Sequence, residues 1–174
     1  MEEANATERA VDVADQAAIR AIPARMVEAW NRGSGADFAA PFTGTADFIA
    51  FEGTHLKGRR AIADFHRQLF AEEVKGTRLE GEAKFVQFLS PELAVMHAVA
   101  TVWLAGQQEA SPSRNSMQLF VVRKQQREWL VDAVLNARQL TLERQLFLDQ
   151  FDAMPAQAQR RVIDWVASLA QKPT

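Results

Sequence analysis

Four polar side chains occupy stretches of this sequence that are otherwise apolar: Asp47, His66, His97 and Asn136. Burial disfavours the charged form of a carboxyl or an imidazole, and it can move the pKa into a range that suits proton transfer. An amide has no titratable proton, but it can orient a carbonyl group or a water. These four residues are therefore the candidate catalytic groups, for proton-transfer chemistry that needs no cofactor.

Asp47 alternates with Ile49 and Phe51 in the segment 45–52, which has the period of a strand. If these three residues share a largely apolar face, burial raises the pKa of the Asp47 carboxyl and suits it to act as a general acid or base. The alternative is that Asp47 caps a turn or pairs with an arginine near the mouth of a pocket.

The two candidate histidines fall on a predicted helix, 59–75, and on a predicted strand, 93–104. His66 lies on or beside the apolar stripe of the helix, where a neutral imidazole can relay a proton. The alternative for His66 is a core residue whose hydrogen bonds are satisfied. His97 lies in the middle of the strand, and it either lines a pocket or has a buried structural or interface role.

A second group of residues can contact a ligand without doing chemistry. Asp132 is expected on the same strand face as Asn136, and Gln118 and Ser116 can supply hydrogen bonds from the neighbouring strand. Three aromatic side chains can line a pocket for a planar ligand, or they can belong to the core or an interface. The candidate ligand-binding residues are Trp30, Phe51, Trp103, Gln118 and Asp132.

Composition excludes several other kinds of site. There are 20 Lys and Arg against 22 Asp and Glu, giving a net charge of −2, so no basic field for nucleic acid is expected. The chain has no cysteine, which excludes disulfides, thiolate nucleophiles and cysteine-based metal sites. Three histidines on three different elements indicate no metal site, and no glycine-rich dinucleotide motif is present.

The first residues are acidic and lack the apolar core of a signal peptide. No apolar run approaches the roughly 20 residues that span a bilayer. We therefore expect a cytoplasmic protein with no membrane partner.

Hydrophobic periodicity gives the order of the expected elements. A helix begins at Asp15 as its N-cap, and a strand and a further helix precede a run of strands. The expected elements are a helix at 15–30, a helical turn at 37–42, a strand at 45–52, a helix at 59–75, and strands at 78–89, 93–104, 115–124 and 129–138. Helices segregated before strands that short polar loops join indicate an α+β fold with a curved antiparallel sheet.

The chain divides into a flexible N-terminus at 1–14, a main domain at 15–138 and a C-terminal helical extension at 139–174. The extension carries two apolar stripes, one from Leu142 to Phe151 and one after Pro155. Strand 93–104 is apolar on both faces, so both faces need cover. We expect a homodimer formed through the sheet, and the helical extension is the alternative cover.

This order of elements resembles the nuclear-transport-factor-2-like superfamily, which includes the SnoaL-like proteins, over roughly residues 15–138. Short motifs are similar, more narrowly, to the SgcJ/EcaC-type family: Ala18-Ile19-Arg20, Trp30-Asn31-Arg32-Gly33, Ala46-Asp47-Phe48, Phe51-Glu52-Gly53, Gly58-Arg59, Ala61-Ile62, Phe65-His66 and Asn136. The resemblance implies a cone-shaped, cystatin-like α+β fold with the N-terminal helices packed on the sheet and a pocket inside.

The resemblance also bears on the chemistry. Related folds place a polar residue late in the strand that holds Asn136, pointing into the cavity, and the SnoaL-like cyclases use an acid there. An amide cannot abstract a proton, so Asn136 departs from that pattern. The chain has no tyrosine, so the phenolic donor that ketosteroid isomerases use is missing.

Three functions remain open, and whether the protein is an enzyme is not decided. The first is a pocket for a small hydrophobic or aromatic ligand, with cofactor-free isomerase, cyclase or hydrolase chemistry in secondary metabolism. There Asp47 or a histidine would transfer the proton, and Asn136 would orient the substrate. The second is a dimeric ligand-binding module without turnover. The third is a protein-interaction module whose helical extension is the functional surface.

Overall fold

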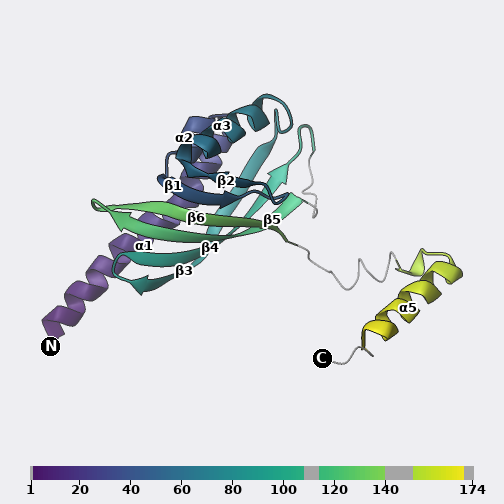
Figure 1. Ribbon diagram of the computed structural model, residues 1–174. Helices are drawn as coiled ribbons and strands as arrows, with labels where there is room; N and C mark the ends of the chain where they lie inside the picture. The colour runs from purple at the N-terminus through teal and green to yellow at the C-terminus, as the bar shows by residue number, and fades with distance from the viewer. Residues whose placement is uncertain (1, 108–113, 140–150, 171–174) are drawn as a thin grey trace. The chain divides into compact units, whose positions relative to one another are not determined.

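The computed structural model in Figure 1 describes residues 2–107, 114–139 and 151–170. Its elements are α1 (Glu2–Asn31), α2 (Gly35–Ala39), β1 (Phe42–Ile49), β2 (His55–Lys57), α3 (Gly58–Ala71), β3 (Arg78–Ser90), β4 (Leu93–Trp103), β5 (Asn115–Gln125), β6 (Glu128–Arg138) and α5 (Ala156–Ala170). The predicted α+β class is confirmed, with N-terminal helices, a curved sheet and a helix near the C-terminus. The chain forms two compact units, 1–139 and 140–174.

One six-stranded sheet, in the order β2-β1-β6-β5-β4-β3, forms the main unit. Every neighbouring pair is antiparallel except β1 and β6, which are parallel. The expectation of a purely antiparallel sheet is therefore wrong at this pair. Strands in parallel need a long crossover between them, and the segment from β2 through β5 supplies it.

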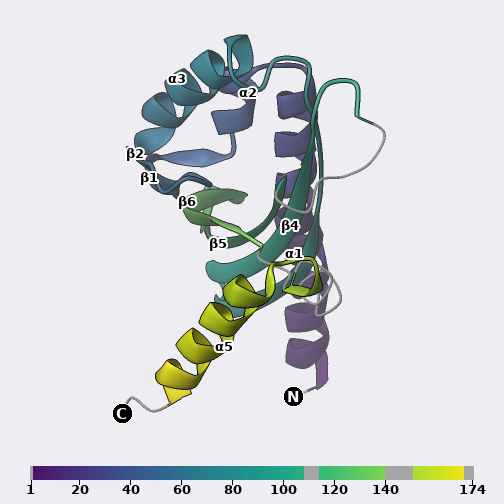
Figure 2. The same cartoon turned by 90° about the vertical axis from the view of Figure 1, so that its right-hand side faces the viewer.

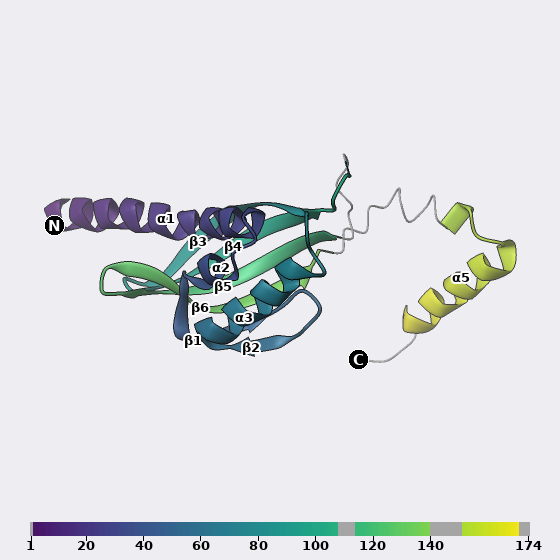
Figure 3. The same ribbon diagram turned by 90° about the horizontal axis from the view of Figure 1, so that it is seen from above.

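Helices α1, α2 and α3 cover one face of the sheet (Figure 2). Helix α1 lies along β3 and α3 lies along β1, as Figure 3 shows from above. The core lies between these helices and the sheet. Its largest fully buried side chains are Phe42, Ile19, Ile22, Ile62, Met96, Val122 and Val131.

The opposite face of the sheet, called the outer face below, carries apolar side chains that stay accessible in this chain. They include Ile49, Phe85, Met117, Leu119 and Leu135, which are between 36% and 49% exposed. No helix among the described residues of the main unit covers this face (Figure 2). The prediction that strand 93–104 needs cover on both sides therefore remains, since one side is still exposed in the main unit.

Helix α1 begins at Glu2, so the prediction that Asp15 caps it is wrong. Asp15 lies inside the helix and is only 9% exposed. Its carboxylate accepts hydrogen bonds from Lys124 Nζ at 2.7 and 2.8 Å and from Trp129 Nε1 at 2.9 Å. The carboxylate is satisfied by the β5–β6 hairpin and not by the helix's own backbone, so it ties α1 to the end of the sheet.

In the C-terminal unit, the helix predicted after Pro155 is confirmed as α5. The stripe predicted from Leu142 to Phe151 lies almost wholly outside the described residues. Whether the helical extension covers a surface, and whether residues 1–14 are flexible, stays a prediction. Among the described residues, no helix is both long and apolar enough to cross a membrane.

Candidate functional site

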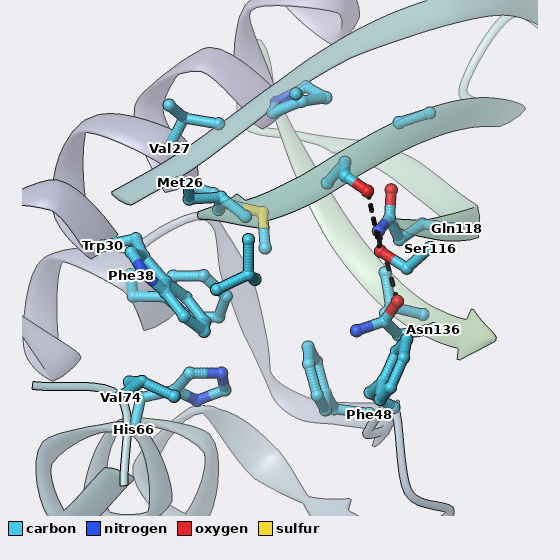
Figure 4. Close-up of a pocket in the computed structure, with 18 of the residues that line it drawn as sticks. Met26, Val27, Trp30, Phe38, Phe48, His66, Val74, Ser116, Gln118 and Asn136 are labelled. Carbon is cyan, nitrogen blue, oxygen red and sulfur yellow. Dashed lines mark hydrogen bonds between the residues drawn. The ribbon is translucent and has the colours of Figure 1, made fainter. Parts of the chain in front are cut away.

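A cavity of about 200 Å³ lies between the three N-terminal helices and the inner face of the sheet (Figure 4). Most of its lining is apolar, with contributions from Met26, Val27, Leu69, Val74, Ala98 and Val134. An apolar cavity of about 150 Å³ is large enough for benzene, so this one has room for a ring with a few substituents. This cavity lies where the fold resemblance implies a pocket, and that it holds a ligand stays a prediction.

An aromatic wall closes the helical side of the cavity. Trp30 comes from α1, Phe38 from α2 and Phe48 from β1, and all three line the cavity. The Trp30 and Phe38 rings pack edge to face, with their centroids 6.2 Å apart. Trp30 Nε1 donates a hydrogen bond to Thr77 Oγ1 at 3.1 Å. Because the indole N–H is already bonded, Trp30 presents only its apolar ring to a ligand.

His66 lies against this wall, stacked on Phe38 with ring centroids 3.9 Å apart. Two glycines make the arrangement possible. A Cβ at Gly35 would lie 2.5 Å from the Ala63 carbonyl oxygen, so α2 can pack this closely on α3 only with glycine there. A Cβ at Gly58, which has φ +85°, would lie 2.7 Å from the Gly44 oxygen where α3 begins.

The His66 side chain is 2% exposed, and its Nδ1 lies 2.8 Å from the Ile62 carbonyl oxygen. A carbonyl can only accept, so Nδ1 carries the proton and Nε2 is a lone-pair acceptor. Burial lowers the pKa of the His66 imidazole from 6.5 to about 4, although the Ile62 hydrogen bond opposes the change. The ring is therefore neutral at neutral pH.

The Nε2 atom of His66 has no hydrogen-bond partner among the described residues. In that part of the chain, Thr43 Oγ1 is the one polar side-chain atom that is both sealed in protein and unpartnered. His66 Nε2 is therefore not sealed in protein, and His66 lines the cavity. A free acceptor thus faces the hollow from a side chain that is otherwise wholly buried (Figure 4).

A polar wall faces the cavity from the sheet and consists of Ser116, Gln118 and Asn136 (Figure 4). Gln118 Nε2 donates to Ser116 Oγ at 2.6 Å and to Asn136 Oδ1 at 3.1 Å. Ser116 Oγ in turn donates to the Ala100 carbonyl oxygen at 3.4 Å. Antiparallel pairing of β5 with β6 places Gln118 opposite Asn136, so the sheet register brings this wall together.

Of the residues predicted from the sequence, five line this one cavity. They are His66, Asn136, Trp30, Phe51 and Gln118. Phe51 lies under the Arg138 guanidinium, whose Cζ is 4.9 Å from the ring centroid. The other four predicted residues lie outside the cavity.

Asp47 is the first of these four. Its carboxylate accepts from Lys57 Nζ at 2.7 Å and bonds His55 Nε2 at 2.8 Å, at an exposed site. The hydrogen bonds from Lys57 and His55 lower the pKa of Asp47, whereas burial on an apolar face was expected to raise it. Asp47 and Ile49 belong to the outer row of β1, and the inner row is the one that contains Phe48.

His97 stacks on Phe85 at 4.1 Å between centroids, on the outer face. Trp103 Nε1 donates to Glu80 Oε2 at 3.0 Å near the sheet edge. Neither lines the cavity. Both belong to the row of β4 whose side chains point away from the helices.

Asp132 accepts from Arg123 Nε at 2.6 Å and does not share a face with Asn136. The β5–β6 register pairs Val121 with Ala133 but Val122 with Val131, so Asp132 is an extra residue in the ladder. Because of this β-bulge, the residues of β6 that point toward the helices are odd-numbered before it and even-numbered after it. Simple alternation was therefore the wrong rule for Asp132.

Sequence reasoning missed Phe38 and Phe48 as lining residues. Phe48 alternates with Ala46 and Ala50, a small apolar row that was less conspicuous than the row of Asp47. Three charged residues also line the cavity and are exposed: Glu52, Glu73 and Arg114. Within the described ranges, no group of three or more acidic or histidine side chains could hold a metal ion.

No family model and no curated protein matches this sequence. Among solved structures, a domain of unknown function with a cystatin-like fold from Nostoc punctiforme is 59% identical, with a TM-score of 0.74. That match covers 91% of this chain and 98% of that chain.

Two more distant structures share the fold. A nuclear-transport-factor-2-like protein with a cystatin-like fold from Novosphingobium aromaticivorans is 19% identical, with a TM-score of 0.68, covering 81% of this chain and 92% of that one. A ketosteroid isomerase-like protein from Erwinia carotovora is 17% identical, with a TM-score of 0.56, covering 71% and 95%. At these identities the likeness concerns the fold alone.

Proposed function

We propose that this chain binds one small, flat, mainly apolar molecule in its cavity. It belongs to the same family as the cystatin-like domain that is 59% identical to it, and its fold is that of the nuclear-transport-factor-2-like proteins. The observation that carries this proposal is His66 Nε2, an acceptor with no protein partner among the described residues on a side chain that is 2% exposed. Because this acceptor is reachable from the cavity, a ligand group that donates to it can form a hydrogen bond worth about 0.5–1.5 kcal/mol.

Binding fits the cavity better than strong acid–base catalysis does. The two carboxylates in the lining, Glu52 and Glu73, are exposed, and Asp47 is outside it. An imidazole with a pKa of about 4 is a weak base toward a carbon acid at neutral pH. The aromatic wall and the apolar lining instead suit the faces of a planar ring.

Cofactor-free proton transfer of the isomerase, cyclase or hydrolase type is the second candidate. One observation favours it: neutral His66 and Asn136 line the same cavity. In that reaction His66 would relay the proton and Asn136 would orient a substrate carbonyl. Turnover of a bound ligand that is lost in both His66→Phe and Asn136→Leu would support it over simple binding.

Filling the cavity tests the proposed function. Ala100 lines the cavity on β4, and Ala100→Phe should occupy much of the available volume. We expect this variant to lose binding of benzene, phenol and related one-ring probes by at least about tenfold, measured by calorimetry or ligand-observed NMR.

The matched control is Ala133→Phe, which adds the same side chain in the outer row of β6. It should bind these probes as the wild type does. If no one-ring probe binds the wild type at millimolar concentration, or if Ala100→Phe binds as well as the wild type, the proposed function is wrong.

We propose further that a second copy of the chain covers the outer face. Its accessible apolar side chains form adjacent rows on β4, β5 and β6, through pairings such as His97 with Leu119 and Leu119 with Leu135. Such an apolar, uncharged centre can pack on itself about a twofold axis. The expected cytoplasmic location also remains a proposal.

Substitution at the centre of the outer face tests the dimer. Leu119→Arg should convert a dimer to a monomer in analytical ultracentrifugation at micromolar concentration, because an unpaired charge would be buried in the interface. Val13→Glu is the control, since Val13 is 68% exposed on α1, away from this face. A wild-type protein that sediments as a monomer would contradict the proposal.

A further inference from the structure

The chemistry of the ligand is inferred from two groups in the lining that have no partner among the described residues, His66 Nε2 and Asn136 Nδ2. The first is His66. The bond from its Nδ1 to the Ile62 carbonyl fixes the tautomer, so Nε2 accepts and cannot donate while the ring is neutral. A ligand atom placed there must therefore carry an O–H or an N–H.

The second free group is the amide nitrogen of Asn136. Gln118 donates both of its amide hydrogens, one to Ser116 Oγ and one to Asn136 Oδ1. Because Asn136 Oδ1 must accept, the amide is held with its Nδ2 as the remaining polar group, and no described residue accepts from that nitrogen. Figure 4 shows Asn136 Nδ2 turned toward the hollow. Gln118 is thus a positioning residue, and a ligand atom near Asn136 must be an acceptor such as a carbonyl oxygen.

The charges of the lining indicate an uncharged ligand. Among the described residues of the lining, Arg114 is the one cation, and Glu52 and Glu73 are acids, all of them exposed. No cation lies among the buried lining residues, so a carboxylate or phosphate inside would be desolvated without a partner. A bound ammonium would likewise have no buried carboxylate beside it.

From these contacts we infer that the ligand is an uncharged ring compound that carries a hydroxyl or N–H donor for His66 and a carbonyl-type oxygen for Asn136. This inference rests on the proposed binding function and adds the polarity of the ligand to it. The aromatic wall of Trp30, Phe38 and Phe48 packs on the ring, and the two polar groups fix its direction in the cavity.

A panel of simple probes tests the inference. The three isomers of hydroxybenzaldehyde carry both groups, phenol lacks the acceptor, and benzaldehyde and methoxybenzaldehyde lack the donor. We expect the best hydroxybenzaldehyde isomer to bind about tenfold more tightly than phenol or benzaldehyde, because one neutral hydrogen bond is worth about a factor of ten. The preferred isomer reports the separation between the two protein groups.

Variants assign each preference to its residue. His66→Phe should abolish the preference for hydroxybenzaldehyde over methoxybenzaldehyde and keep the preference for a carbonyl. Asn136→Leu should abolish the preference for a carbonyl and keep the preference for hydroxybenzaldehyde over methoxybenzaldehyde. Gln118→Leu frees the Asn136 amide to rotate, so it should weaken the carbonyl preference, and Gln87→Leu on β3, an exposed position outside the lining, should change neither.

The outcomes separate this inference from the proposed function. If all one-ring probes bind equally and both variants leave that unchanged, the ligand polarity is wrong while the binding function stands. If the donor preference survives in His66→Phe, the assignment of Nε2 is wrong. If no probe binds at all, the binding function itself fails.

Discussion

Lowering the pH from 7 to 4 should cost this protein about 3 kcal/mol of unfolding free energy through His66 alone. The imidazole has a pKa near 6.5 in the unfolded chain and about 4 in the fold, because burial disfavours the imidazolium. Between these values the unfolded state binds more protons than the folded state. Stability therefore falls as the pH drops through this window, and above about pH 7 the group contributes no pH dependence.

Comparison with a variant isolates this contribution. His66→Gln removes the titrating group and keeps a polar side chain at the position. The free energy of unfolding of both proteins is measured with denaturant from pH 7 to 4. The difference between them should change by about 3 kcal/mol in favour of the variant, because the contributions of the other titrating groups are the same in both proteins and cancel.

Ile62→Val is the matched core control for this series, since Ile62 is fully buried on the same helix. It should cost about 1 kcal/mol at every pH, because it removes one buried methyl group. A His66→Gln difference that is flat between pH 7 and 4 would contradict the buried, neutral imidazole on which the site depends.

Asp15→Ala should destabilise the protein by about 2–4 kcal/mol, the second large effect that the structure indicates. The substitution leaves the Lys124 ammonium, three-quarters buried, without its carboxylate, and it leaves the buried Trp129 Nε1 without an acceptor. Burial raises the pKa of the Asp15 carboxyl, but the hydrogen bonds from Lys124 and Trp129 outweigh it and lower the pKa overall. The stabilisation is therefore present at neutral pH and is lost in acid, as Asp15 protonates.

Two comparisons make this prediction specific. Asp37→Ala removes a carboxylate that pairs with Arg32 at an exposed site, and it should cost much less than Asp15→Ala does. Lys124→Met in an Asp15→Ala background should recover part of the loss, because no buried ammonium then remains unpaired. If Asp15→Ala costs no more than Asp37→Ala by thermal or denaturant unfolding, the link between α1 and the β5–β6 hairpin does not stabilise the fold.

Most of the fold can be predicted from the sequence, because each long helix or strand has a clear hydrophobic periodicity and ends at clear turn residues. The four strands from Arg78 to Arg138 begin and end within about one residue of their predicted limits. The short strand β2, three residues long, was missed because so short a segment shows no alternation. The parallel pairing of β1 with β6 joins segments far apart in the chain, and local patterns do not report such contacts.

The site could be predicted only in part, and the reason lies in the sheet. Asn136 was predicted because related folds place a polar residue late in its strand, and Gln118 because it lies on the neighbouring strand. Both line the cavity, and their role in a site stays a prediction. Asp47 was assigned to the wrong side because both rows of β1 are apolar around it. The prediction that Asp132 shares a face with Asn136 was wrong because a β-bulge shifts which residues of β6 point inward. No residue type in β6 indicates the bulge.

His66 illustrates what the structure adds to a prediction that the sequence leaves open. The sequence places it on or beside an apolar stripe, which is compatible either with a proton relay or with a satisfied core histidine. The structure shows that one nitrogen is satisfied by Ile62, while the other has no described partner and the residue lines the cavity. Which nitrogen is bonded and which is free depends on side-chain packing, including the stacking of Phe38 on one face of the ring. The periodicity of a sequence does not predict such packing.

A high-resolution crystal structure of the protein soaked with the preferred hydroxybenzaldehyde isomer tests the central claim most directly. We predict density for one ring between the aromatic wall and the polar wall, with its hydroxyl oxygen within hydrogen-bond distance of His66 Nε2 and its carbonyl oxygen within that distance of Asn136 Nδ2. A hollow closed by its own side chains, or left without the probe at saturating concentration, would contradict it.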